Sequence, residues 1–323
     1  MTNEELYIAR VLFINRMLKT DGDGFQQLFW QVMSAKHGSD FVAIRPQGTF
    51  GDGGNDGYLS AEGHYFQVYG PVAPAEKVTE AASKLVGDFE KLKAFWNKSI
   101  PIRSYSFVFN DKYHGTFTKI AEALAKIEKD NPGVRCRPFT AGQMEDAFLT
   151  LTATDMNGII GFLPDPTKII NIDYGILRDV ISYIMNSPIS SFATRLGDLP
   201  ELDDKIQLNE LCTGWGDIIR AGARQTGHVD TYFSKNSGFM KQQLKTHLVG
   251  LYQHARDGWR DKPAIPTGTQ LADFVFLAFR NDLLPPNATQ AVQAAVDVLI
   301  GYYFEACDVF DPHAAKDSPS ASP

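Results

Sequence analysis

Cysteines and long apolar runs are both scarce in this chain. Its 323 residues contain three cysteines, Cys136, Cys212 and Cys307, which lie far apart and form no CxxC pair. This spacing excludes a disulfide scaffold and a zinc knuckle, and it predicts a reducing, cytoplasmic environment. No window approaches the roughly 18 uninterrupted apolar residues of a membrane span, so we expect none. We also expect no signal peptide, because charged residues such as Glu5 and Arg10 interrupt the first apolar positions.

An excess of basic residues is missing as well. The chain has 31 Lys and Arg against 38 Asp and Glu, a formal net charge of -7. Bulk charge of this sign does not attract a polyanion, so nucleic acid would need a local basic surface or metal ions. Residues 1–160 carry 17 basic and 19 acidic side chains, whereas residues 161–323 carry 14 and 19. We therefore expect any nucleic-acid contact in the first half.

Length and apolar pattern indicate two domains of different class. Hydrophobic residues make up 44% and charged residues 21%, an ordinary globular composition, over about twice the usual domain length. The first part predicts the order α-α-β-β-β-α-β-α-β-α, which is typical of an α/β sandwich with a mixed sheet. The second part predicts only helices. We therefore predict an α/β domain over 1–155, a linker over 155–165, an all-α domain over 166–310 and a disordered tail over 311–323.

The helical spacing of the second part is clear in five segments. They cover 170–186, 206–222, 237–256, 268–281 and 287–308. The last segment contains consecutive aromatic residues, Tyr302, Tyr303 and Phe304. Aromatic side chains dominate both cores and interfaces. We favour a position in the core, with a partner-docking surface as the alternative.

The stretch from Phe41 to Pro71 contains the residues that indicate chemistry. GDGGNDG places Asp52 and Asp56 among glycines, and the strand that follows carries Gln67 and Tyr69. Strand residues two apart face the same side, so Gln67 and Tyr69 can both face Asp56. Oxygen ligands of this kind suit a hard divalent cation such as Mg²⁺. The alternative is an ordinary loop, because Asp, Asn and Gly are the commonest turn residues.

This pattern resembles the restriction-endonuclease-like PD-(D/E)xK superfamily, in particular its Mrr-like nucleases. Their core pattern is GDGGxDG followed by a strand bearing Q-x-K, which GDGGNDG and YFQVY resemble. The preceding helix FQQLFWQVMSAKHG and the later strand 105–109, helix 114–129 and strand 134–138 are similar to the rest of that core. The resemblance covers roughly residues 20–150. It implies a restriction-endonuclease-like sandwich and a DNA endonuclease that depends on Mg²⁺ or Mn²⁺.

The resemblance also implies roles for individual residues. Asp56 corresponds to the metal-binding aspartate, with Asp52 as a second candidate ligand, and Gln67 corresponds to the first residue of Q-x-K. Two positions differ from the family: Tyr69 stands where the lysine is expected, and Gln26 stands where the helix has a glutamate. The candidate catalytic set is therefore Asp56, Gln67 and Tyr69.

Tyr69 changes the expected electrostatics of the site. A lysine supplies fixed positive charge near the attacking water, whereas tyrosine is neutral at pH 7 and can only orient a water. A cation from elsewhere can replace it, with Arg45, Lys36 and Lys112 as candidates, and Arg45 and Lys36 are also candidate phosphate ligands. Three hypotheses remain. The protein is a metal-dependent endonuclease, or a nuclease fold that has lost cleavage and binds DNA or acts as a scaffold, or a hydrolase of a nucleotide or other small phosphate ester at the same site.

The second part resembles a different family. LDDKIQLNELCTGW (202–215) and VDVLIGYYFEACDVF (296–310) are similar to the helical C-terminal domain of effectors in ABC three-component systems, which include Lamassu-type anti-phage defence. The resemblance implies an SMC-like ABC ATPase and a small middle-component protein as partners. It also implies a homo-oligomer. DNA as the substrate follows from the nuclease resemblance, and we expect no membrane partner because long apolar runs are missing.

Overall fold

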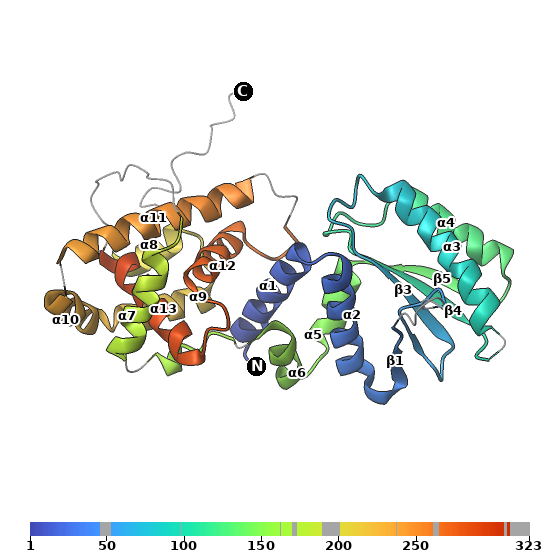
Figure 1. Ribbon diagram of the computed structural model, residues 1–323, viewed down its shortest axis with the longest axis horizontal. Coiled ribbons are helices and arrows are strands. Elements are labelled where there is room, and N and C mark those ends of the chain that lie inside the picture. Colours follow the sequence, from blue (N-terminus) through green and yellow to red (C-terminus); the bar gives the residue numbers. More distant parts are fainter. Residues whose placement is uncertain are drawn as a thin grey trace, which may run out of the picture. The chain divides into compact units, whose positions relative to one another are not determined.

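The computed structural model describes residues 1–45, 53–97, 99–161, 163–169, 173–188, 201–236, 238–260, 265–306 and 309–310. The chain divides into two compact units (Figure 1). Unit 1 comprises Met1 and Leu12–Gly161, and unit 2 comprises Thr2–Val11 and Phe162–Pro323. Helix α1 (Asn3–Lys19) therefore contributes to both units, whereas the sequence assigned all of 1–155 to the first domain. The tail predicted over 311–323 lies outside the described residues.

Unit 1 is an α/β unit with the predicted order of elements. The elements after α1 are α2 (Gly22–His37), η1 (Gly38–Asp40), β1 (Phe41–Ala43), β2 (Gly57–Leu59), β3 (His64–Tyr69), α3 (Val78–Trp96), β4 (Ser104–Phe109), α4 (Thr118–Asp130), β5 (Arg135–Phe139), α5 (Ala141–Leu149) and α6 (Ala153–Ile160). Over the described residues the sheet has five strands in the order β1-β2-β3-β4-β5. The β1–β2 and β2–β3 pairs are antiparallel, and the β3–β4 and β4–β5 pairs are parallel. The predicted mixed sheet is confirmed.

The sheet is covered by helices on both faces (Figure 1). Helices α3 and α4 pack together over one face, and α2 and α5 pack over the other. Alternate residues of β3 separate accordingly: Tyr65 packs in the core under α3, whereas Phe66 contacts Phe29 of α2. Both faces are therefore buried, as expected for parallel strands with crossover helices.

The predicted linker begins too early. Residues 153–160 form helix α6, and the division between the units falls after Gly161. The side chain of Thr152 accepts the backbone N–H of Asp155, which satisfies one of the open donors at the helix start. Met156 and Ile159 are buried, so the short helix belongs to the core of unit 1.

Unit 2 contains helices and no strands among its described residues. Its elements are η3 (Pro166–Lys168), α7 (Tyr174–Met185), α8 (Leu202–Leu208), α9 (Thr213–Ala223), α10 (Thr226–Asn236), α11 (Gly238–Arg260), α12 (Leu271–Leu283) and α13 (Gln290–Ala306). The single helix predicted over 206–222 is wrong: it divides into α8 and α9 around Glu210, which has a left-handed φ of 51°. Helix α10 was not predicted. None of the helices in the described part of the chain is long and apolar enough to cross a membrane.

Helix α13 lies in the core of unit 2. Tyr302, Tyr303 and Phe304 are all buried, so the preference for a core position is confirmed. Glycines allow α13 to approach α9 closely. A Cβ atom at Gly301 would lie 2.5 Å from the backbone nitrogen of Ala223, and one at Gly222 would overlap the carbonyl oxygen of Asp297. These two helix backbones therefore pack against each other without intervening side chains.

Replacing Gly301 with alanine is expected to lower the free energy of unfolding by about 1–3 kcal/mol, because the added methyl group overpacks this contact. Gly227→Ala in α10 is the matched control, since a Cβ there meets no atom within 4 Å. The control is expected to raise stability by up to about 1 kcal/mol, the usual gain from removing a helical glycine. Urea unfolding of the full chain measures both. Equal changes in the two variants would contradict the close α9–α13 contact.

Candidate functional site

Asp56 lies where the glycine-rich stretch joins the sheet. Its backbone N–H donates to the carbonyl of Phe66 at 2.8 Å. Phe66 is also the partner of Gly57, so Asp56 and Gly57 both lie against Phe66 where β2 begins. The carbonyl of Asp56 accepts the backbone N–H of Ile44 at 3.0 Å and the indole N–H of Trp30 at 2.7 Å. Contacts from β3, α2 and the end of β1 thus fix the position of Asp56.

The carboxylate of Asp56 is buried, with 4% of the residue exposed. Oδ2 accepts the backbone N–H of Val68 at 2.7 Å, and Oδ1 accepts the side-chain amide of Gln26. The Val68 N–H lies beyond the first residue of β2, where no backbone carbonyl of β2 can accept it. The Asp56 carboxylate accepts it instead. The helix position at which the family has its glutamate therefore contacts Asp56 directly, here through Gln26.

Gln67 faces α3 from the middle of β3. It is on the same side of the strand as Tyr65 and Tyr69, and only 1% of it is exposed. Its Oε1 atom has no hydrogen-bond partner among the described residues. A buried amide oxygen without a partner costs about 1–3 kcal/mol, so such atoms call for an explanation. A bound cation or water on the α3 side of β3 would supply the missing interaction.

Tyr69 does not restore the charge of the family lysine. Its hydroxyl donates to Oε1 of Glu80 at 2.8 Å, on the first turn of α3. Burial, followed by this hydrogen bond, raises the pKa of Tyr69 to about 12. The phenol is therefore neutral at pH 7. Gln67 and Tyr69 share a face as predicted, but the Tyr69 hydroxyl is directed to Glu80.

The candidate cations have three different positions. The guanidinium of Arg45 lies 5.6 Å from the ring centre of Trp30, whose N–H contacts Asp56, so Arg45 borders the site. Lys36 does not: it is in the last turn of α2, about 15 Å along the helix from Gln26. Lys112 Nζ donates to the carbonyls of Met17, Leu18 and Thr20 at the end of α1. Lys112 therefore caps a helix, and it does not replace the family lysine.

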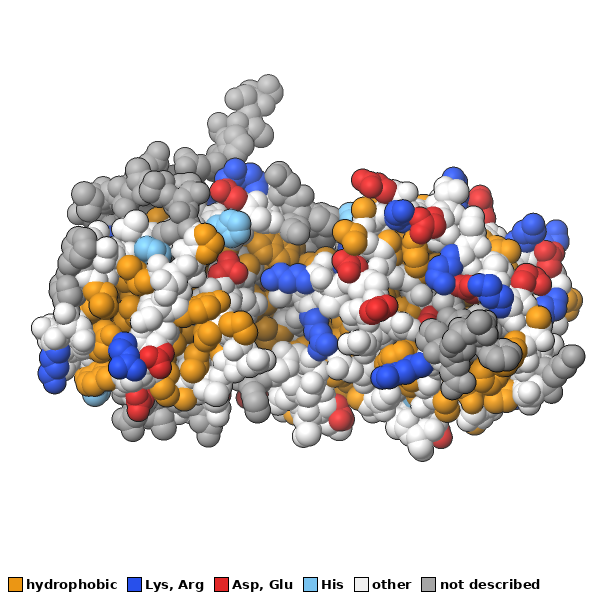
Figure 2. All heavy atoms as spheres, viewed as in Figure 1, with side chains coloured by type: hydrophobic (Ala, Val, Ile, Leu, Met, Phe, Trp, Pro, Cys, Tyr) orange, Lys and Arg blue, Asp and Glu red, His pale blue; other side chains and the backbone are white. Residues whose placement is uncertain are grey.

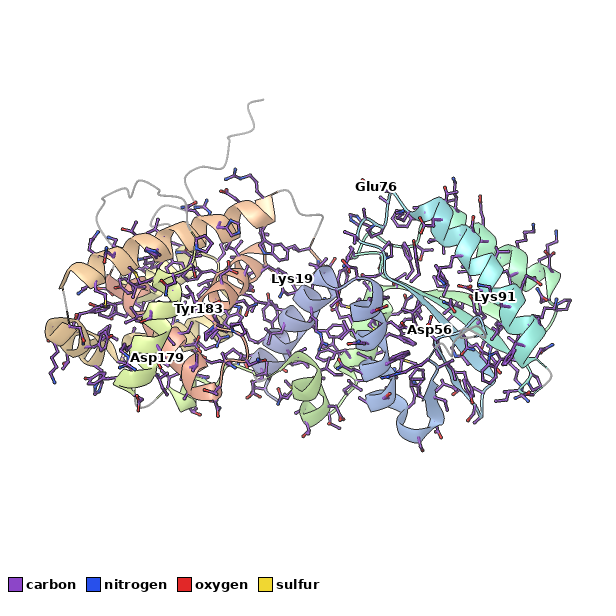
Figure 3. All side chains as sticks on the ribbon, in the orientation of Figure 1. Lys19, Asp56, Glu76, Lys91, Asp179 and Tyr183 are labelled. Atoms are coloured by element: carbon purple, nitrogen blue, oxygen red, sulfur yellow. The ribbon has the colours of Figure 1, made fainter. Side chains whose placement is uncertain are left out.

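Helix α3 borders the glycine-rich stretch. A Cβ atom at Gly54, where φ is 82°, would overlap the carbonyl oxygen of Asp88, so only glycine fits there. Asp88 itself is buried and binds Lys84 and Lys91 (Figure 3 labels Lys91 and Asp56). The sequence predicted α3 but not this cluster. In the sequence, the cluster is indicated by a charged residue, Asp88, between the apolar positions Leu85 and Phe89.

The donors near Asp56 suit a hard cation. Asp56 and Gln67 offer one carboxylate and one amide oxygen, the ligand types that Mg²⁺ and Mn²⁺ accept along with water. The described ranges contain no group of three or more His, Cys, Asp and Glu side chains that could hold a metal. Asp52, the other predicted ligand, lies outside the described residues. Among the described residues, one carboxylate is therefore available to a metal ion, and water would have to fill most of its coordination positions.

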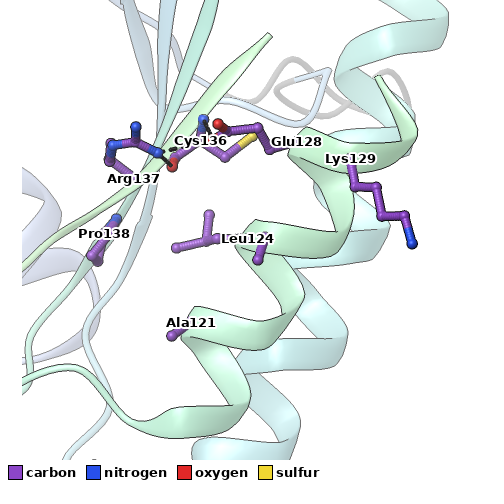
Figure 4. A pocket seen from close by; sticks show the side chains of 8 residues that line it. Ala121, Leu124, Glu128, Lys129, Cys136, Arg137 and Pro138 are labelled. Carbon is purple, nitrogen blue, oxygen red and sulfur yellow. Dashed lines mark hydrogen bonds and ion pairs between the residues drawn. The ribbon is translucent and has the colours of Figure 1, made fainter. Parts of the chain in front are cut away.

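A groove of about 480 Å³ lies at the opposite edge of the sheet, between α4 and β5 (Figure 4). Glu128 accepts the backbone N–H of Cys136 at 2.8 Å and the guanidinium of Arg137 at 2.9 Å. Pro138 has no N–H to offer. These features block the outward donors of the edge strand, so the groove does not provide a site for an added β-strand.

No protein-family model, no curated protein and no solved structure matches the chain. Similarity to known proteins therefore assigns it neither a family nor an activity. A function can be proposed only from the geometry around Asp56 and from the two resemblances in the sequence.

Proposed function

We propose that unit 1 is a PD-(D/E)xK nuclease domain that cleaves DNA with Mg²⁺ or Mn²⁺. The observation that carries this proposal is the buried carboxylate of Asp56 beside β3, together with the buried Oε1 atom of Gln67 on that strand, which has no partner in the described part of the chain. Burying a polar atom in this way is unfavourable, and a cation that binds both side chains offsets the cost. The fold alone does not require such an oxygen.

The side chains around the site have separate roles in this proposal. Asp56 and Gln67 hold the metal ion, which polarises a phosphate oxygen and lowers the pKa of its bound water when it is present. Gln26 and the Val68 N–H keep the Asp56 carboxylate in place. Tyr69, neutral and hydrogen-bonded to Glu80, orients water. Arg45 contacts a phosphate of the DNA.

We further propose that the chain is the effector of an ABC three-component, Lamassu-type anti-phage system. The resemblance of 202–215 and 296–310 to that class supports this assignment. In it, the helical unit mediates self-association and docking to an SMC-like ABC ATPase and a small middle-component protein. The absence of an SMC-like ATPase gene beside the gene for this chain would contradict the assignment.

A second candidate function is a nuclease fold without cleavage that binds DNA or acts as a scaffold in the same complex. Two contacts favour it. Both carboxylate oxygens of Asp56 already accept hydrogen bonds, and the Tyr69 hydroxyl is directed to Glu80. In this case Asp56 ends a strand and binds no metal.

Gln67→Met separates the two candidates. In the absence of metal, it is expected to raise the free energy of unfolding by about 1 kcal/mol, because it removes a buried oxygen without a partner. It should also abolish the increase in melting temperature that Mn²⁺ produces in the wild-type chain. Asn15→Leu is the matched control, since the buried Asn15 Oδ1 likewise has no partner among the described residues. A Mn²⁺-induced increase that persists in Gln67→Met would contradict the metal site.

A further inference from the structure

The last two residues of α3 are aromatic, and their side chains pack against the glycine-rich stretch. A Cβ atom at Gly53, where φ is 64°, would lie 3.1 Å from the ring of Phe95 and 2.6 Å from the indole nitrogen of Trp96. Both rings therefore pack directly on the backbone of Gly53, which only a glycine allows. Gly53 lies three residues before Asp56, so the two rings border the candidate site.

Phe95 is the outermost of four connected aromatic rings. Its ring centre lies 5.6 Å from that of Trp96, which lies 5.3 Å from that of Tyr58 in β2. Tyr58 stacks in turn on Tyr65 of β3 at 5.5 Å, and Tyr65 is buried in the core. Aromatic contacts of this kind hold each ring against the next. The position of Phe95 is therefore fixed from the core outward, before any ligand binds.

Phe95 is nevertheless exposed to solvent. More than half of its surface, 58%, is accessible, which is the largest fraction among the aromatic side chains that the structure describes. The next values are 38% for Tyr174 and 36% for Tyr183, both in unit 2. On the surface of unit 1, hydrophobic side chains appear in small groups among charged ones (Figure 2). An exposed ring that is already held in place allows another ring to stack on it at little entropic cost.

We propose that Phe95 stacks on a base of the DNA strand that is cleaved at Asp56, so that the substrate of the site is single-stranded or locally unpaired DNA. This inference rests on DNA as the substrate of the proposed function. A base in a duplex has a neighbour on each face and must leave the stack before it can contact the ring. Stacking also needs no positive charge, which suits a chain whose net charge is -7.

The distance along the chain agrees with a contact close to the cleaved bond. The three residues from Gly53 to Asp56 span at most about 11 Å. One strand of DNA advances by about 3.4 Å per nucleotide, so the stacked base lies within about three nucleotides of that bond. A negatively supercoiled plasmid, in which strand separation is favoured, remains a suitable substrate.

The test is fluorescence anisotropy of the full chain in EDTA, so that no cleavage occurs. The fluorescein-labelled ligands are a short oligothymidine strand, an abasic strand with the same phosphates, and a hairpin duplex. Phe95→Leu keeps an apolar side chain but removes the aromatic ring, and it is expected to raise the dissociation constant for oligothymidine about tenfold. For the abasic strand and the duplex, which offer no free base, the expected change is less than about twofold. Phe95→Trp is expected to retain wild-type binding, because its larger ring also stacks.

Val86→Ala is the matched control, because Val86 is another exposed apolar residue of α3, with 40% of its surface accessible. It is expected to bind all three ligands as the wild-type chain does. Thermal unfolding checks that each variant is folded, which we expect because both positions are exposed. Four results would each overturn the proposal: wild-type binding of oligothymidine by Phe95→Leu, equal weakening for the abasic strand, equal weakening in Val86→Ala, or no binding of oligothymidine by the wild-type chain.

Cleavage is scored separately, in Mg²⁺. Binding that depends on Phe95 without any cleavage contradicts the endonuclease alone. Cleavage of single strands that does not need Phe95 contradicts the stacking contact alone.

Discussion

Asp56→Asn is expected to abolish DNA cleavage, by at least about a hundredfold, and to destabilise unit 1. The loss of stability follows from the number and charge of the hydrogen-bond acceptors at position 56. An amide offers one acceptor oxygen where the carboxylate offers two, so both contacts survive only if the Gln26 amide turns over, and the charge-assisted contacts of the carboxylate become neutral ones. The expected loss in the free energy of unfolding is about 1–3 kcal/mol.

The double variant Asp56→Asn/Gln26→Glu separates the structural role of Asp56 from its role in DNA cleavage. The introduced amide can then donate to the introduced carboxylate while its oxygen accepts the Val68 N–H, so both contacts are restored and the net charge is unchanged. We expect thermal unfolding to return close to the wild-type value while plasmid cleavage stays absent. Cleavage that returns together with stability would show that Asp56 has only a structural role.

Asp297→Ala is expected to lower the free energy of unfolding of the helical unit by about 3–5 kcal/mol. Arg280 in α12 binds both carboxylate oxygens of Asp297 in α13, with its Nε 2.6 Å from Oδ1 and an Nη 2.9 Å from Oδ2. Both residues are buried. Removing the carboxylate leaves the buried guanidinium without its bidentate partner. Urea unfolding of the full chain measures the effect.

The double variant Arg280→Met/Asp297→Leu is the control for this pair. Apolar side chains of similar size often replace a buried ion pair at little cost, so we expect its stability to lie close to that of the wild-type chain. A loss as large as that of Asp297→Ala would show that packing around α12 and α13, and not the unpaired charge, explains the single variant.

The sequence predicted the elements of unit 1 because their patterns are local. The alternation along β3 and the three- and four-residue spacing from Val78 to Trp96 can be recognised without any knowledge of the rest of the fold. Helix α6 was missed because its stability depends on a cap at Thr152 and on tertiary burial of Met156. The break at Glu210 was missed because no Gly or Pro marks it.

Much of the candidate site could not be predicted, since it depends on contacts between distant residues. Gln26 and Asp56 are thirty positions apart, and only the fold brings the amide to the carboxylate. The sequence alone shows that Lys36 lies ten residues from Gln26 along one helix. It does not show that the site lies beside the start of that helix. Gln67 Oε1 lacks a partner because the fold buries it. A sequence pattern does not show which polar atoms the fold will bury.

Plasmid cleavage tests the central claim most directly, namely that Asp56 holds a metal ion for phosphodiester hydrolysis. The full chain is incubated with plasmid DNA and Mg²⁺ or Mn²⁺, alone and together with the proposed ATPase and middle-component partners and ATP. We predict cleavage by the wild-type chain in at least one of these conditions, and none by Asp56→Ala or by Asp56→Asn/Gln26→Glu. Cleavage that survives Asp56→Ala would contradict the site, and no cleavage in any condition, with phage protection intact in the Asp56→Ala strain, would contradict the nuclease.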